Sequence, residues 1–96
     1  MRMILIVYSG PAPDVVPAIL DAQETHGYTR FSHAHGAGVS GRREGTRAWP
    51  GDAEVYFSIV AAEAVDPILQ AVEKRQRSAI PGERLHAAAL PVESFL

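Results

Sequence analysis

Two runs of the chain are apolar at most positions, and they limit its possible folds more than any other feature. They are RMILIVYS at 2–9 and AEVYFSIVA at 53–61. Their length and their β-branched and aromatic content predict β-strands. Because alternate side chains of a strand point to opposite faces of its sheet, both faces of a sheet built from these strands are expected to be apolar.

A helical pattern follows the first run. Pro17 has no N–H to donate inside a helix, so it must lie in the first turn, and Asp14 is the expected N-cap. Gly27 is expected to end this helix as its left-handed C′ residue. The apolar stripe of the helix consists of Val15, Val16, Ile19 and Leu20.

A second helical pattern follows the second run. Asp66 is expected as its N-cap and Pro67 as its first helical residue, since proline suits that position and disfavours helical angles in the residue before it. Pro81 and Gly82 end the pattern. Its apolar stripe consists of Val65, Ile68, Leu69 and Val72.

Two further strands complete the expected order. YTRFSHAHGA at 28–37 alternates loosely, and RLHAAALPV at 84–92 follows the second helix. The order β-α-β-β-α-β predicts an α+β fold of the ferredoxin-like type, with an antiparallel sheet and both helices on one face. We expect a single domain over 1–96. We expect self-association to cover the apolar sheet face without helices; the alternative is a strand-rich core with a somewhat apolar face exposed to solvent.

Composition excludes several classes of function. The chain has 96 residues, no cysteine and a formal net charge of −2. Disulfides and thiolate metal sites are therefore excluded, and a general nucleic-acid binder would be more basic. The N-terminal apolar run is too short for a membrane span and lacks the features of a signal peptide, so we expect a cytoplasmic protein.

A glycine-rich segment separates the two middle strands. Gly36, Gly38 and Gly41 spell G-x-G-x-x-G, but the motif follows the second strand and opens no helix, so the dinucleotide-binding interpretation is rejected. The G-x-x-x-x-G-K-[ST] motif of P-loops is absent. The segment 36–52 is expected to be a long loop. Its backbone N–H groups and three arginines suit an anion, although they also fit a solvated loop; the arginines are Arg42, Arg43 and Arg47.

The residues also carry a family resemblance. The β-α-β-β-α-β order, the segment GTRAWPGDAEVYFSIV at 45–60 and the ending LHAAALPVESFL resemble the PII-like proteins, in the superfamily of the PII signal transducers and the CutA proteins. The resemblance implies a homotrimer with ligand clefts between subunits, and a T-loop at 36–52 that contacts a target protein. PII proteins that bind ATP or ADP have a glycine- and lysine-rich loop before the last strand. Here RSAIPGE at 77–83 has one glycine and no lysine, which argues against the usual mode of adenine-nucleotide binding.

Carried over by position, the resemblance suggests a set of ligand-binding residues. Trp49 is either a stacking platform in the subunit cleft or a cap on the apolar core. Arg84, at the start of the last strand, can join the loop from the neighbouring segment. The full set is Gly36, Gly38, Arg42, Arg43, Arg47, Trp49 and Arg84.

Two histidines form a candidate metal site. In a strand, the i, i+2 spacing of His33 and His35 places both imidazoles on one face, where they can share a divalent metal if another subunit supplies further ligands. The alternative is that both are surface or hydrogen-bonded residues. His26 suits a helix C-terminus and His86 a structural role in the last strand.

No nucleophile, base and orienting group come together in the sequence, so we expect no enzymatic activity. The preferred hypothesis is a trimeric PII-like regulatory protein that binds a nucleotide or another small anionic metabolite and contacts a target protein through 36–51. The first alternative is a CutA-like protein that binds a divalent metal, and the second is a small enzyme of unknown reaction.

Overall fold

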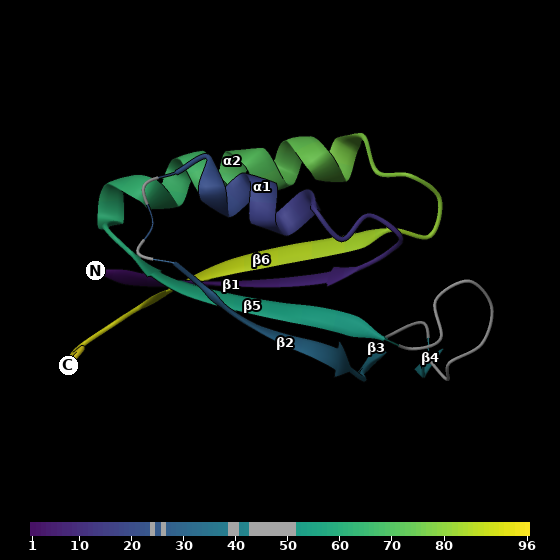
Figure 1. Ribbon diagram of the computed structural model, residues 1–96, viewed down its shortest axis with the longest axis horizontal. Helices are drawn as coiled ribbons and strands as arrows, with labels where there is room; N and C mark the ends of the chain where they lie inside the picture. Colours follow the sequence, from purple (N-terminus) through teal and green to yellow (C-terminus); the bar gives the residue numbers. More distant parts are fainter. Residues whose placement is uncertain (24, 26, 39–40, 43–51) are drawn as a thin grey trace.

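A computed structural model describes residues 1–23, 25, 27–38, 41–42 and 52–96. Figure 1 shows two helices packed on one side of a sheet, as the sequence predicts. The elements are β1 (Arg2–Ser9), α1 (Val15–Asp21), β2 (Thr29–Ala34), β3 (Ala37–Gly38), β4 (Gly41–Arg42), β5 (Ala53–Val60), α2 (Ala62–Arg77) and β6 (Arg84–Pro91).

The main sheet has the strand order β2-β5-β1-β6, and all of its pairs are antiparallel. β1 lies between β5 and β6, where Leu5 pairs with Phe57 on one side and with Ala88 on the other. This topology confirms the ferredoxin-like fold. The short strands β3 and β4 form a separate hairpin inside the expected long loop.

The core lies between the sheet and the two helices. Ile4 and Ile6 of β1 are fully buried, as is Ile68 of α2. These residues come from alternate strand positions and from the apolar stripes of the helices, so burial of the two patterns drives their packing. The other core residues are Tyr8, Val16, Leu20, Tyr56, Val60, Val72 and Leu85.

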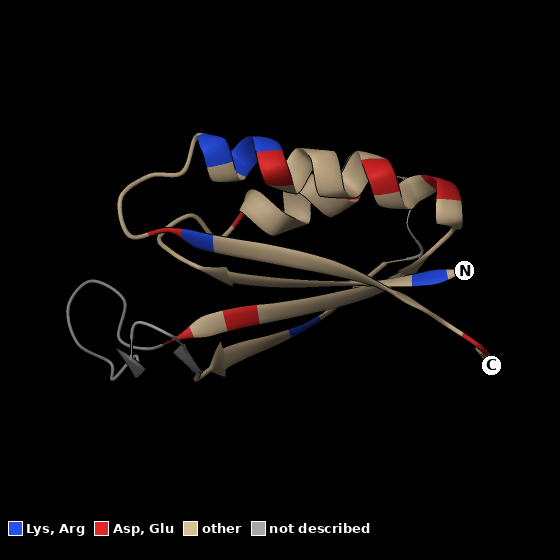
Figure 2. Cartoon of the chain, turned by 180° about the vertical axis from the view of Figure 1, so that it is seen from behind, with Lys and Arg blue, Asp and Glu red and all other residues tan. Residues whose placement is uncertain are grey.

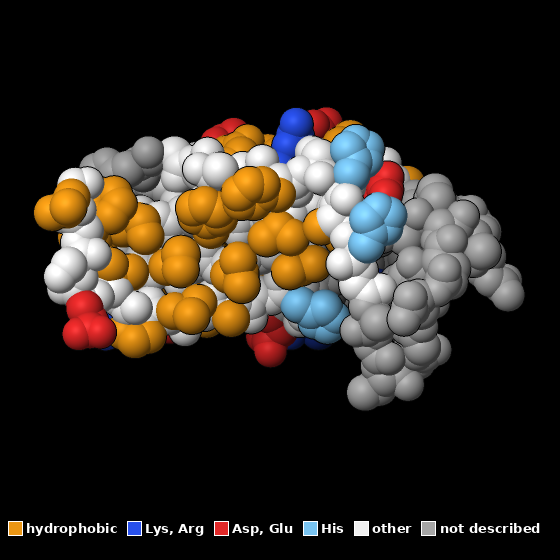
Figure 3. Space-filling view, turned by 90° about the horizontal axis from the view of Figure 1, so that it is seen from below, with side chains coloured by type: hydrophobic (Ala, Val, Ile, Leu, Met, Phe, Trp, Pro, Cys, Tyr) orange, Lys and Arg blue, Asp and Glu red, His pale blue; other side chains and the backbone are white. Residues whose placement is uncertain are grey.

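The sheet face away from the helices is also apolar, and we call it the open face. Figure 3 shows hydrophobic side chains across most of this face. Phe31 packs against Phe57 with ring centroids 5.8 Å apart and is 57% exposed. The prediction of two apolar sheet faces is therefore confirmed. The open face carries Met3, Leu5, Val7, Phe31, Val55, Phe57, Ile59 and Leu90.

The predicted end of the first helix is wrong. Asp14 occupies the N-cap position, without a side-chain capping hydrogen bond, but α1 ends at Asp21 rather than near Gly27. Leu20 is the last buried residue of this helix, and Asp21 and Ala22 after it are exposed. Gly27 has a φ of +99° and lies in the connection to β2 instead.

The predicted start of the second helix is also wrong. α2 begins at Ala62, with Ala61 as its N-cap, and Pro67 lies inside the helix. Ala64 and Val65 pack against the core ahead of the proline, which stabilises the additional first turn. Proline removes one intrahelical hydrogen bond, and the helix continues through Pro67 despite that loss.

The basic residues of α2 gather at its C-terminal end. Lys74, Arg75 and Arg77 lie in the last turn, and Glu63 lies in the first turn. Figure 2 shows this cluster of basic residues at the end of the helix that leads to β6. The arrangement complements the helix dipole, which favours cations near the C-terminus and anions near the N-terminus. Among the described helices, none is long and apolar enough to cross a membrane.

Candidate functional site

Four strands have a terminus at the same end of the sheet: β1 and β2 end there, and β5 and β6 begin there. The segment 36–52 connects β2 to β5 at this end. We call this region the loop base. Ser9 at the end of β1 pairs with Arg84 at the start of β6, and Ala34 of β2 pairs with Ala53 of β5. The Ser9 hydroxyl donates a hydrogen bond of 3.0 Å to the backbone carbonyl of Asp52. This contact ties β1 to the residue that precedes β5.

The two histidines of the predicted metal pair both lie near Asp52. His33 Nδ1 lies 2.9 Å from Asp52 Oδ2, within hydrogen-bond distance, and His35 Nε2 lies 3.9 Å from Asp52 Oδ1. Strand alternation does not produce this arrangement, because the β2–β5 register shifts between Phe31 and Ala34 and His33 has a φ of 60°. In the part of the chain that the structure describes, no group of three or more His, Cys, Asp or Glu residues could hold a metal ion.

A buried carboxylate lies directly beside the loop base. Glu83 accepts hydrogen bonds from Arg75 Nε at 2.9 Å, from Arg75 Nη2 at 2.8 Å and from the Tyr8 hydroxyl at 2.6 Å. Its side chain is only 1% exposed. The Tyr8 oxygen also accepts from the backbone N–H of Ala12 at 3.1 Å. We call these three side chains the Tyr8–Glu83–Arg75 cluster. It fixes the residue that precedes Arg84 in the chain.

The electrostatics of this cluster keep Glu83 charged and Tyr8 neutral. The hydrogen bonds from Arg75 lower the pKa of the Glu83 carboxyl below its usual range. Desolvation by burial, followed by the hydrogen bond to Glu83, raises the pKa of Tyr8 to about 12. The cluster is therefore fully paired at neutral pH, when Tyr8 acts as a donor.

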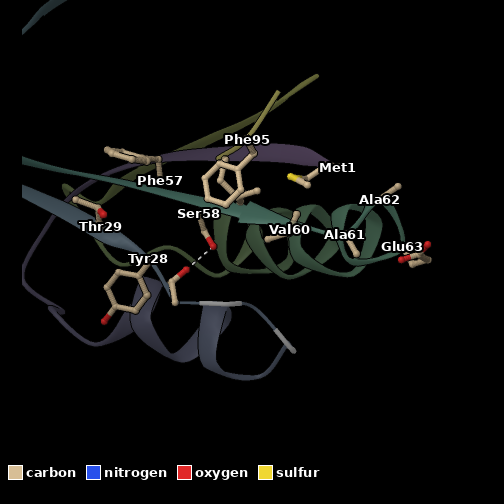
Figure 4. Close-up of a pocket in the computed structure, with 12 residues that line it drawn as sticks. Met1, Tyr28, Thr29, Phe57, Ser58, Val60, Ala61, Ala62, Glu63 and Phe95 are labelled. Atoms are coloured by element: carbon tan, nitrogen blue, oxygen red, sulfur yellow. Dashed lines mark hydrogen bonds between the residues drawn. The ribbon is translucent and has the colours of Figure 1, made fainter. Parts of the chain in front are cut away.

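A pocket of about 850 Å³ lies at the opposite end of β5 from the loop base. Figure 4 shows its walls, which come from the connection before β2, the end of β5 and the start of α2. Tyr28 and Phe57 contribute aromatic rings, and Phe95 approaches from the C-terminal segment. Its few polar side chains are Thr29, Ser58 and Glu63. A mostly apolar pocket with a few polar groups is typical of small-molecule sites.

The structure brings together only part of the predicted ligand set. Gly36 and Arg84 lie at the loop base, Gly38 lies in β3 and Arg42 in β4. Arg43, Arg47 and Trp49 lie outside the described residues.

Sequence reasoning missed Asp52, the Tyr8–Glu83–Arg75 cluster and the pocket. Asp52 directly precedes a strongly predicted strand, which is the one signal that could have identified it. The walls of the pocket come from segments far apart in the sequence, so no local pattern indicates them.

Comparison with solved structures places this fold among known proteins. No family model and no curated protein matches the sequence. CPII, a nitrogen regulatory PII-like protein from Thiomonas intermedia K12 bound to ADP, AMP and bicarbonate, is 19% identical with a TM-score of 0.70, over 97% of this chain and 88% of that chain.

Two further structures agree with this result. The apo form of CPII has a TM-score of 0.66 at 16% identity, over 95% of this chain and 89% of that one. A PII-like signalling protein candidate from Thermus thermophilus has a TM-score of 0.59 at 22% identity, over 92% of this chain and 82% of that one. The strand order and these similarities together show that the chain has the fold of the PII-like proteins.

Proposed function

We propose that this chain is a PII-like regulatory protein, without catalytic activity, that binds an adenine nucleotide. The observation that carries the proposal is the pocket of about 850 Å³ with aromatic and apolar walls, on a fold whose solved example CPII holds ADP and AMP. Apolar and aromatic side chains suit a purine base, because its flat faces are poorly hydrated.

The phosphates of the nucleotide need cationic side chains, and the described pocket lining contains no lysine or arginine. Arg84 and the arginines of the 36–52 segment supply such groups, but Arg84 lies at the other end of the sheet. We therefore infer that the complete site forms between two copies of the chain. The pocket of one copy takes the base, and the loop base of its neighbour takes the phosphates. This arrangement replaces the glycine- and lysine-rich loop that the sequence lacks.

The open face supplies a reason for the copies to associate. The face consists of aliphatic and aromatic side chains. Two of them are well exposed to solvent, Phe31 at 57% and Leu90 at 38%. Burial of such a surface is the main driving force in stable homo-oligomers. We propose a homotrimer with the open faces turned toward its centre. In this proposal the segment 36–51 contacts a target protein, and nucleotide binding at the loop base controls that contact.

Titration calorimetry tests the nucleotide proposal. ADP and AMP are titrated into the purified chain, with and without bicarbonate, and we expect saturable binding of ADP. Arg84→Ala is expected to weaken ADP binding at least threefold, since it removes a phosphate partner. The matched control is Arg77→Ala, because Arg77 is exposed on α2 and already pairs with Glu73. Absence of heat with every nucleotide, in a folded and associated sample, would contradict the proposal.

A further inference from the structure

One hydroxyl is buried where an apolar side chain would be expected. Among the residues that the structure describes, Ser58 is the only polar residue that is buried as a whole, at 3% exposure. It lies on the helix-facing side of β5 between Tyr56 and Val60, which are each 1% exposed. Burial of a hydroxyl without a partner is unfavourable, so its hydrogen bond is what makes serine tolerable here.

The partner of Ser58 lies far away in the sequence and belongs to the wall of the pocket. Ser58 Oγ donates a hydrogen bond to the backbone carbonyl of Gly27, drawn as the dashed line in Figure 4. Both residues line the pocket. The bond therefore joins the connection before β2 to the end of β5 across the inner side of this wall.

Gly27 is a position where the backbone needs such support. Its φ of +99° is a conformation that other residues rarely adopt, and open space surrounds the place of a Cβ atom. A side chain at this position would therefore find no packing partner. The next residue, Tyr28, packs against Tyr56 in a tilted arrangement, with ring centroids 5.6 Å apart. Ahead of the β2–β5 ladder, which begins at the pair Thr29 and Phe57, this hydrogen bond and this aromatic contact join the wall to β5.

We propose that Ser58 is a positioning residue that holds Gly27 and Tyr28 in the shape that the ligand needs before it binds. The proposal rests on the proposed function, in which an adenine nucleotide occupies the pocket. A wall that is already ordered reduces the conformational entropy lost on binding, and this raises affinity for the ligand. Selection for a preformed wall also explains a serine in a layer of buried apolar side chains.

The affinity experiment uses ADP as the probe and compares three variants of the full chain. Ser58→Ala removes the donor and is expected to weaken ADP binding three- to tenfold. Ser58→Thr keeps the hydroxyl and is expected to remain within twofold of wild type. Val72→Ala is the control, since it opens a cavity in the core on α2 at a buried position outside the pocket. It is expected to lower the unfolding temperature without changing the affinity for ADP.

A second measurement does not depend on ADP binding. Hydrogen exchange is followed by mass spectrometry in peptides that cover 27–31 of the ligand-free protein, well below the unfolding temperature. Ser58→Ala is expected to accelerate exchange there, whereas Ser58→Thr and Val72→Ala are not. Failure of wild type to bind ADP would refute the proposed function, and the exchange data would still decide the role of Ser58. Unchanged exchange in Ser58→Ala would overturn the inference.

Discussion

The hydroxyl of Tyr8 donates a hydrogen bond of 2.6 Å to the carboxylate of Glu83, which lies 75 residues later in the chain. This bond joins the end of β1 to the connection that precedes β6. Arg75 of α2 completes the cluster with a bidentate ion pair to the same carboxylate. Three elements at the loop base therefore depend on one buried charge, which makes Glu83 a sensitive position for mutation.

Glu83→Gln is expected to lower the free energy of unfolding by about 1–3 kcal/mol, because the partly buried Arg75 guanidinium then loses its ionic partner. Urea denaturation followed by circular dichroism measures this difference. Glu73→Gln is the control, since Glu73 forms an exposed i, i+4 pair with Arg77 and its loss is expected to change stability by less than about 0.5 kcal/mol. Equal effects of the two variants would contradict the role of the cluster.

The carboxylate of Glu83 predicts that the protein loses stability at acidic pH. The folded protein lowers the pKa of Glu83 below the value of 4.5 that the carboxyl has when unfolded, so the ionised group stabilises the fold above that pH. This contribution is lost as the pH falls from 4.5 through the lower folded pKa. We expect wild type to lose more stability than Glu83→Gln over this acidic range, and denaturation at a series of pH values measures the difference. Parallel curves would contradict the prediction.

Tyr8 predicts a loss of stability at alkaline pH. Folding raises its pKa from 10.0 to about 12, so the neutral hydroxyl stabilises the fold fully below pH 10, and this contribution disappears as the pH rises toward 12. The pKa of Tyr56 also rises to about 12, through burial and then its hydrogen bond to Glu54. Tyr8→Phe is expected to flatten the alkaline loss of stability only in part, because Tyr56 still titrates. Ultraviolet titration of the tyrosinates checks the assignment.

A substitution at Gly10 tests the packing around the Tyr8–Glu83–Arg75 cluster. A Cβ atom at Gly10 would lie 2.6 Å from the Tyr8 hydroxyl oxygen and 2.9 Å from its ring carbon Cζ, so Gly10→Ala must displace the tyrosine. We expect a loss of about 1–3 kcal/mol in the free energy of unfolding. Gly36→Ala is the matched control, because nothing lies within 4 Å of its Cβ position. It is expected to be nearly neutral.

Because the open face is the proposed subunit interface, one charged side chain placed on it is expected to dissociate the trimer. Leu5 lies on this face at the centre of β1, where it pairs with Phe57 and Ala88. Leu5→Glu places a carboxylate in the proposed interface, and we expect a monomer by light scattering where wild type is a trimer. Gln70→Glu, on the exposed side of α2, is expected to leave the trimer intact. A wild-type monomer at micromolar concentration would contradict the proposed assembly.

Periodicity predicted the elements of this fold better than their ends. The two apolar runs form strands at 2–9 and 53–60 as expected, with Ala61 as the N-cap of α2 instead, because a continuous apolar run reports burial on both faces of a sheet. Gly27 and Pro67 were misleading, because each residue permits a helix boundary without requiring one. The helices instead begin and end where packing against the core begins and ends, and that packing is a property of the tertiary structure.

The candidate site was less predictable than the fold. Asp52, Glu83 and Ser58 each have a partner 19 to 75 residues away, and Arg75 lies eight residues before Glu83, so neither helix nor strand periodicity indicates these contacts. The pocket has the same origin, since its walls meet only when β2, β5 and α2 are assembled. The role of Arg84 stays a prediction, and it depends on a neighbouring copy that the sequence alone does not position.

The place of β1 in the sheet has a consequence for how the chain folds. β1 bonds along its whole length to β5 on one side and to β6 on the other, and neither neighbour is close to it in sequence. During synthesis, this strand leaves the ribosome well before both of its partners. The β1–β6 ladder cannot form until β6 has emerged, and such non-local pairing is expected to make folding slow for a domain of this size.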